Sequence, residues 1–149
     1  MKISEKFLGG PLISFEIFPP QKDSPLSSIF KTIDELADLK PDYISVTYGA
    51  TGGQSIRTAE IASIIKNKYG IDPLAHITAV RNSKDDIRKE VERMYDNNIE
   101  NILALRGDNV PAEAQANDFK YAQELIQFIR DEYKDKFCLA GACYPEGHV

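Results

Sequence analysis

A carboxylate lies inside an otherwise apolar segment near the start of the chain. Glu16 falls within the run Ile13–Pro20, which ends in two prolines. Removal from water favours the neutral form of a carboxyl group, so we expect a raised pKa and a side chain able to act as a general acid near neutral pH. A structural ion pair with a cation such as Arg106 is the alternative, and the segment alone does not separate the two.

A cation, a glycine and an acid end another apolar run, Asn101–Arg106. In Arg106-Gly107-Asp108, the planar guanidinium is suited to paired hydrogen bonds with phosphate oxygens. The alternative is an arginine–aspartate pair at the surface. His76 lies in a further apolar run, and a single histidine there is more often bonded to a backbone carbonyl than catalytic. It gains weight only if other polar side chains converge on it.

Two loops carry further candidates. Tyr48–Gly53 holds three glycines, which let backbone approach a ligand closely, but its spacing matches neither a dinucleotide fingerprint nor a phosphate-binding P-loop, and taken alone it is better read as a plain connection. Tyr144–His148 places an aromatic ring and an imidazole together, where the ring either stacks on a flat heterocycle or simply packs. Cysteine and histidine spacing predicts no metal site, and no serine or cysteine lies in a nucleophile elbow.

The elements that must position these residues alternate along the chain. Short aliphatic and aromatic runs predict five strands, at 12–18, 43–48, 74–80, 101–106 and 138–144. Apolar residues three or four apart predict four helices between them, with Pro25 and Ser83 near helix starts and Gly70 near a helix end. Strand centres 31, 31 and 28 residues apart indicate one repeated unit, and hence parallel strands joined by right-handed crossovers.

The two faces of the strands favour a closed barrel over an open doubly wound sheet. Bulky apolar residues alternate with small or polar ones, whereas an open sheet covered on both faces is apolar at nearly every position. In the fourth strand we assign Leu103 and Leu105 to the helix-facing side. A (β/α)8 barrel of the TIM type needs about 250 residues, so residues 1–149 are expected to form one partial barrel domain, with a second chain or self-association completing it.

Charge and hydropathy exclude several classes of partner. The formal net charge of −5 comes from interspersed acids and bases, and no basic stripe suggests nucleic acid. No apolar run reaches membrane-spanning length, and the first residues lack the apolar core of a secretory signal. We therefore expect a cytoplasmic protein that binds a small molecule, and no membrane partner.

Taken together, the motifs resemble the successive strand-end motifs of the methylenetetrahydrofolate reductases, in order and spacing along the whole chain. They are Ser14–Pro20, Ser45–Ala50, His76–Thr78, Ile102–Asp108 and Tyr144–His148. The resemblance implies a barrel that binds FAD without a Rossmann fold. It also implies hydride transfer from NADH or NADPH to the flavin, and then to 5,10-methylenetetrahydrofolate, giving 5-methyltetrahydrofolate by a ping-pong scheme.

The resemblance also implies roles for individual residues. Glu16 corresponds to the general acid that protonates the folate, and Asp108 to an aspartate near the flavin and the pterin; both would contact the substrate. The other implied flavin contacts are Thr47, His76, Arg106, Gly107, Tyr121, Ala122, Tyr144 and His148. The alternative function is a non-catalytic fragment or subunit that keeps the fold and binds folate or a partner reductase chain, and a flavodoxin-like open domain is a third.

Overall fold

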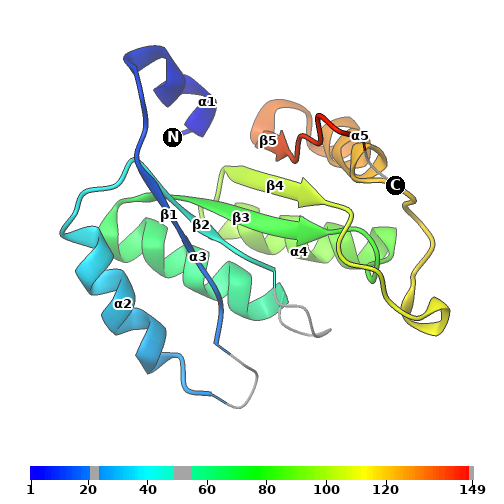
Figure 1. Ribbon diagram of the computed structural model, residues 1–149, viewed down its shortest axis with the longest axis horizontal. Helices are drawn as coiled ribbons and strands as arrows, with labels where there is room; N and C mark the ends of the chain where they lie inside the picture. The colour runs from blue at the N-terminus through cyan, green and yellow to red at the C-terminus, as the bar shows by residue number, and fades with distance from the viewer. Residues whose placement is uncertain (21–23, 49–54, 148–149) are drawn as a thin grey trace.

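The computed structural model describes residues 1–20, 24–48 and 55–147, apart from the side chain of Ser55. Strands and helices alternate along it, as the sequence predicts (Figure 1). The strands are β1 (Ser14–Ile17), β2 (Tyr43–Val46), β3 (Asp72–Thr78), β4 (Asn101–Leu105) and β5 (Cys138–Gly141). The helices are α1 (Ile3–Lys6), α2 (Ser27–Ala37), α3 (Ser55–Tyr69), α4 (Lys84–Asp96) and α5 (Ala122–Tyr133), with short 3-10 turns η1 (Phe7–Gly9), η2 (Ala112–Ala114) and η3 (Lys134–Lys136).

The four crossover helices begin and end where local chemistry favours it. Ser83 and Asp86 form a capping box at the start of α4, in which each side chain accepts from the other residue's backbone N–H. Gly70 follows α3 with a φ of 67°, a left-handed conformation that suits glycine after a helix. The short α1 was not predicted. No helix in the described ranges is long and apolar enough to cross a membrane.

The sheet order identifies the type of α/β fold. All five strands are parallel and follow the chain order β1-β2-β3-β4-β5 without a reversal. A doubly wound open sheet has a point at which the strand order reverses, whereas a barrel adds each strand beside the one before. The described strands therefore form an arc of a TIM-type (β/α) barrel, as predicted.

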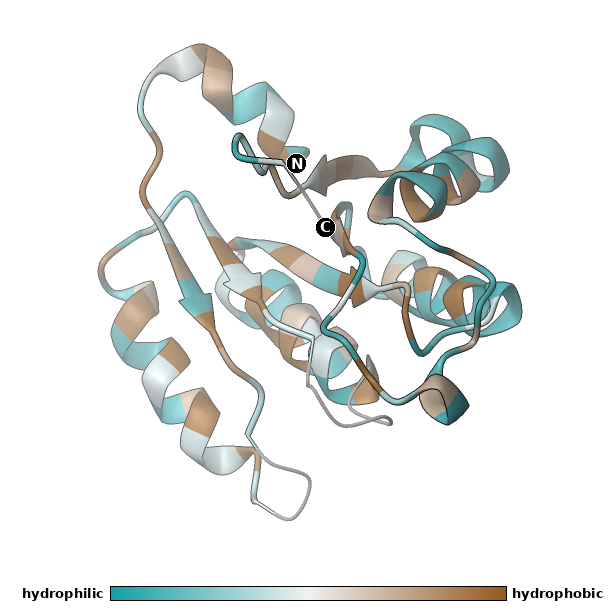
Figure 2. Ribbon diagram, turned by 45° about the vertical axis from the view of Figure 1, so that its right-hand side comes forward, coloured by the Kyte–Doolittle hydropathy of each residue, from teal (hydrophilic) through white to brown (hydrophobic). Residues whose placement is uncertain are grey.

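The helices cover one face of this arc. In Figure 1, α3 and α4 lie behind the strands and α2 lies beside β1, and Figure 2 shows apolar and polar residues alternating along these helices. Ile102 and Ala104 of β4 are fully buried on the helix side, so the assignment of Leu103 and Leu105 to that side was wrong. Leu103 pairs in register with His76, and Leu105 with Thr78, on the inner face. The leucines are large because they line the interior of the barrel, where bulky aliphatic residues are common.

The core lies between the helices and the sheet. Its largest members are fully buried aliphatic side chains, so it supplies much of the apolar burial that stabilises the arc. They include Ile33, Ile44, Ile61, Ile65, Ile77, Ile87, Met94, Ile102, Leu125 and Ile129.

Charges gather at the opposite end of the strands from the candidate site. The carboxylate of Asp72, the first residue of β3, lies 2.9 Å from the Met1 ammonium, 2.6 Å from Lys66 Nζ and 2.9 Å from Lys6 Nζ. Burial alone would raise the pKa of Asp72, but hydrogen bonds from Lys66, the N-terminal ammonium and Lys6 outweigh it and lower that pKa to about 2. These ion pairs connect the N-terminus and α1 to the amino end of β3.

Candidate functional site

Polar side chains from several strands meet in one cavity at the carboxyl ends of the strands. It has a volume of about 300 Å³. In a parallel barrel these ends and the loops after them collect side chains from elements distant in sequence. The cavity is lined by Glu16, Thr47, Tyr48, His76, Thr78, Val80, Arg81, Leu105, Gly107, Asp108 and Val110.

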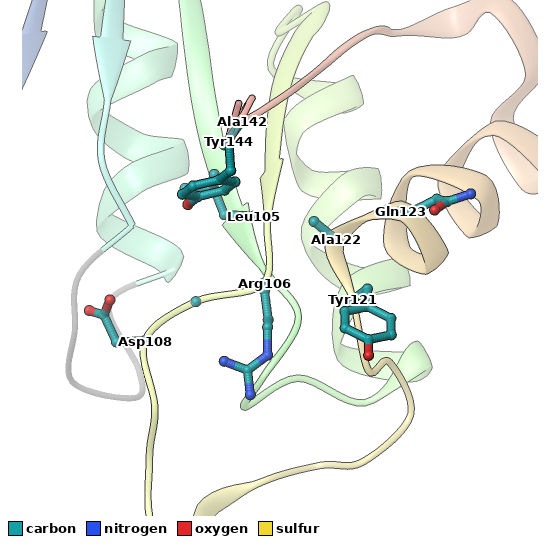
Figure 3. A pocket seen from close by; sticks show the side chains of 9 residues that line it. Leu105, Arg106, Asp108, Tyr121, Ala122, Gln123, Ala142 and Tyr144 are labelled. Carbon is teal, nitrogen blue, oxygen red and sulfur yellow. The ribbon is translucent and has the colours of Figure 1, made fainter. Parts of the chain in front are cut away.

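A second hollow of about 560 Å³ adjoins the first, because Leu105, Gly107 and Asp108 line both. It lies between the end of β4, the start of α5 and the segment after β5 (Figure 3). Its other lining residues are Arg106, Tyr121, Ala122, Gln123, Ala142 and Tyr144.

Three side chains on adjacent strands form a hydrogen-bonded cluster on the inner face. Glu16 of β1 and Ser45 of β2 are register partners, and His76 of β3 lies two residues beyond the partner of Ser45. Side chains two residues apart in a strand point to the same face, so the three meet. Ser45 Oγ lies 2.6 Å from His76 Nε2 and donates to Glu16 Oε2 at 3.4 Å, while His76 Nε2 and Glu16 Oε2 are 3.6 Å apart.

The environments of the two ionisable members differ. Burial lowers the pKa of His76, and the nearby Glu16 carboxylate only partly opposes this, so the imidazole favours its neutral form. Glu16 was expected to be buried, but its side chain is 49% exposed. At β1 the inner face of the arc is not covered by other described elements. The apolar run around Glu16 did not show which face of its strand would be left exposed. The alternative reading, an ion pair of Glu16 with Arg106, is not found among the described residues: Glu16 lies beside His76, and Arg106 donates to Asn109 Oδ1 at 2.9 Å.

The segment after β4 turns sharply at Gly107. Its φ of 90° lies in the left-handed region, and a Cβ built there would approach Val80 Cγ1 to 2.8 Å and Thr78 Cβ to 3.2 Å. Glycine therefore permits the turn that sends Arg106 and Asp108 toward different parts of the two hollows. Figure 3 shows the Arg106 guanidinium and the Asp108 carboxylate on separate sides of the backbone.

The wall opposite Arg106 comes from α5. Tyr121 precedes the first helical residue, Ala122, and no described side chain caps the start of the helix. The first amides of a helix have no partner within it, so they and the helix dipole favour an anion. Tyr144, beyond β5, is 55% exposed and places its ring near Leu105 (Figure 3).

A buried carboxyl lies on the helix side of the same strand ends. Glu90 of α4 is 3% exposed, and its Oε1 atom has no hydrogen-bond partner among the described residues, while Tyr48 donates to Oε2 at a long 3.5 Å. Burial raises the pKa of Glu90 to about 8, against the smaller opposing effects of Arg93 and Tyr48. The group is therefore mostly protonated at neutral pH.

The two hollows bring together the described residues that the sequence singled out. Glu16, Thr47, His76, Gly107 and Asp108 line the first, and Arg106, Tyr121, Ala122 and Tyr144 complete the second. His148 and the loop 49–53 lie outside the described residues. Sequence reasoning missed Ser45 as a member of the site, although its alternation with Ile44 and Val46 placed it on the polar face.

The fold and site together define a barrel-type α/β protein with a strand-end pocket of mixed acidic, basic and aromatic lining. Comparison with known proteins identifies its family. The model of the methylenetetrahydrofolate reductase family matches residues 2–149, and the chain belongs to that family.

Named relatives support the assignment. The chain is 34% identical to "Methylenetetrahydrofolate reductase 1" of Schizosaccharomyces pombe, over 99% of this chain and 26% of that protein. It is 36% identical to the "5,10-methylenetetrahydrofolate reductase" of Escherichia coli K12, over 91% of this chain and 45% of that protein. For "Methylenetetrahydrofolate reductase (NADH) 1" of Zea mays the identity is 33%, over 99% and 26%. The chain thus spans less than half the length of these relatives.

Proposed function

We propose that these residues form the first five strands of a flavin-dependent reductase that converts 5,10-methylenetetrahydrofolate to 5-methyltetrahydrofolate with NADH or NADPH, by a ping-pong scheme. The observation that carries the proposal is the convergence of Glu16, His76 and Asp108, from three separate strands or strand ends, on one cavity. Family membership supports the proposed substrate class.

The residues of the second hollow suit FAD. Arg106 and the uncapped start of α5 offer a planar cation and backbone amides to a diphosphate. The Leu105 and Tyr144 side chains offer apolar and aromatic surface to a flat ring. When bound, the flavin would supply the hydride chemistry, which no amino-acid side chain provides.

The first hollow holds the groups that would act on the folate. Glu16 is the proton donor of the proposal: it would protonate a nitrogen of the folate, so that the methylene bridge opens to a reactive iminium. Asp108 lies at the junction of the two hollows, where it could contact both the flavin and the folate. It would hold the pterin by accepting hydrogen bonds from its N–H groups. Thr47 offers a hydroxyl at the same wall and would contact the flavin and the nicotinamide.

The organisation of the whole protein is part of the proposal. Residues 1–149 would belong to one barrel domain that acts in the cytoplasm. The inner face and the outer edges of β1 and β5 would be covered by further barrel units, from the same polypeptide, a second chain or another copy.

Glu16→Gln in a complete reductase that contains these residues tests the acid. The amide keeps the shape but cannot donate a carboxyl proton, so folate reduction should fall by at least about a hundredfold, the usual scale of general acid catalysis. Flavin reduction by the nicotinamide should be retained. Stopped-flow absorbance separates the two half-reactions, and Glu60→Gln on the outer helix α3 is the matched control. Equal loss of both half-reactions would reject the role of Glu16.

A further inference from the structure

We propose that Ser45 is a positioning residue that couples the protonation of Glu16 to the tautomer of His76. This inference rests on the proposed function, in which Glu16 must be held in place and reloaded with a proton in every turnover. Ser45 itself lies in β2, and nothing in the motif resemblance assigns it a role.

The geometry gives Ser45 the central place in the cluster. Its hydroxyl is 2.6 Å from His76 Nε2 and 3.4 Å from Glu16 Oε2, and it is 7% exposed, so the protein rather than bulk water supplies its partners. The direct His76–Glu16 distance of 3.6 Å is longer than a hydrogen bond, whereas the Ser45–Glu16 contact of 3.4 Å is a long, weak one. The short path between the acid and the imidazole therefore runs through the serine.

A hydroxyl has one proton to donate, so its two contacts cannot both accept. When Glu16 is ionised, Ser45 donates to the carboxylate, and His76 must present Nε2–H to the serine oxygen. When Glu16 is protonated, it can donate to Ser45, whose hydroxyl then turns to the Nε2 lone pair, and the imidazole proton lies on Nδ1. The protonation of Glu16 thus selects the tautomer of neutral His76.

The exchange between the two states moves only protons. In reloading, Glu16 accepts the Ser45 proton, Ser45 accepts the Nε2 proton of a transient imidazolium, and His76 is left neutral with its proton on Nδ1. The imidazolium forms when Nδ1 of His76 accepts a proton from a solvent hydronium ion, which is left as water. No bond between heavy atoms changes and no electrons are transferred.

Few other described ionisable groups lie near His76, so an effect of Glu16 on its tautomer can be recognised. The other ionisable side chains on the cavity are Tyr48, Arg81 and Asp108, and of these and Glu16 only the carboxylate of Glu16 contributes noticeably to the pKa of His76. Burial keeps the imidazole largely neutral, which is the state in which its tautomer can be read. The chain has only two histidines, so His148→Gln assigns the His76 signals.

Imidazole ¹⁵N chemical shifts of the labelled 149-residue chain test the coupling, and they require neither flavin nor folate. In Glu16→Leu the hydroxyl loses its carboxylate acceptor and turns to Nε2, so neutral His76 should shift from the Nε2–H to the Nδ1–H tautomer. In the double variant Glu16→Leu/Ser45→Ala no donor faces Nε2 and the shift should be absent. Glu16→Leu/Ser45→Thr restores a hydroxyl and should restore the shift.

Each outcome of the ¹⁵N measurement supports or overturns the coupling through Ser45. An unchanged tautomer in Glu16→Leu overturns the coupling, even if the alanine variant proves unfolded by circular dichroism. An equal tautomer shift with alanine at position 45 also overturns it, because the serine would then be unnecessary. Since the measurement is independent of turnover, a failed coupling leaves the proposed reductase function standing, and an inactive reductase leaves the coupling measurable.

Discussion

Glu90 offers a perturbation whose size follows from the structure. Its carboxyl is buried on the inner side of α4, one of its oxygens has no partner in the part of the chain that the structure describes, and its pKa is raised from 4.5 to about 8. Between these two pH values the unfolded chain releases the Glu90 proton while the folded chain keeps it. Folding stability therefore falls as pH rises through this window, by about 1.4 kcal/mol per pH unit.

Glu90→Gln removes this penalty because the amide stays neutral in both states. At pH 4 the variant and the parent should have similar stability, and at pH 7 the variant should be more stable by about 3 kcal/mol. Urea unfolding followed by circular dichroism at several pH values between 4 and 8.5 measures the difference. Glu92→Gln, exposed on the same helix, is the control and should run parallel to the parent. A Glu90→Gln curve that also runs parallel would refute the reasoning.

Two further predictions concern other parts of the fold. Asp72→Asn should cost about 2 kcal/mol at pH 7 and little at pH 2, because the pKa of Asp72, lowered to about 2, provides stability that is present above pH 3.8 and lost as pH falls through 2. Urea unfolding with the exposed Asp38→Asn as control checks this, and a pH-independent cost would count against the ion pairs. Gly107→Ala should cost about 3 kcal/mol of stability, because of its left-handed φ and the close approach of the new Cβ to Val80. Gly70→Ala, which has a positive φ but open space around the new Cβ, should cost about 1 kcal/mol. Equal costs by urea unfolding would show that the Val80 side chain moves aside without a penalty.

The order and type of the elements could be predicted because each depends on local pattern. Alternation in β2 and the three-to-four spacing in α4 identify a strand and a helix without further information. Ser83 marked a helix start for a reason the structure confirms, the capping box. The face of β4 could not be predicted, since Ile102, Leu103 and Leu105 are all aliphatic and their direction depends on the register with β3.

The membership of the site was harder to predict than its location. Strand ends gave the location, because parallel strands bring their carboxyl ends together. The exposure of Glu16 depends on what lies across the inner face, which an isolated strand run does not report. The role of Ser45 depends on its register with Glu16, a relation between residues 29 positions apart that no single motif contains.

The central claim is that residues from separate strands and the start of α5 form one flavin-binding pocket. Reconstituting the purified chain with FAD, removing free cofactor by gel filtration and recording the visible spectrum tests it most directly. The account predicts a retained flavin absorbance that Arg106→Ala weakens and that NADH or NADPH bleaches in the absence of oxygen. A colourless parent protein, folded by circular dichroism, would contradict it.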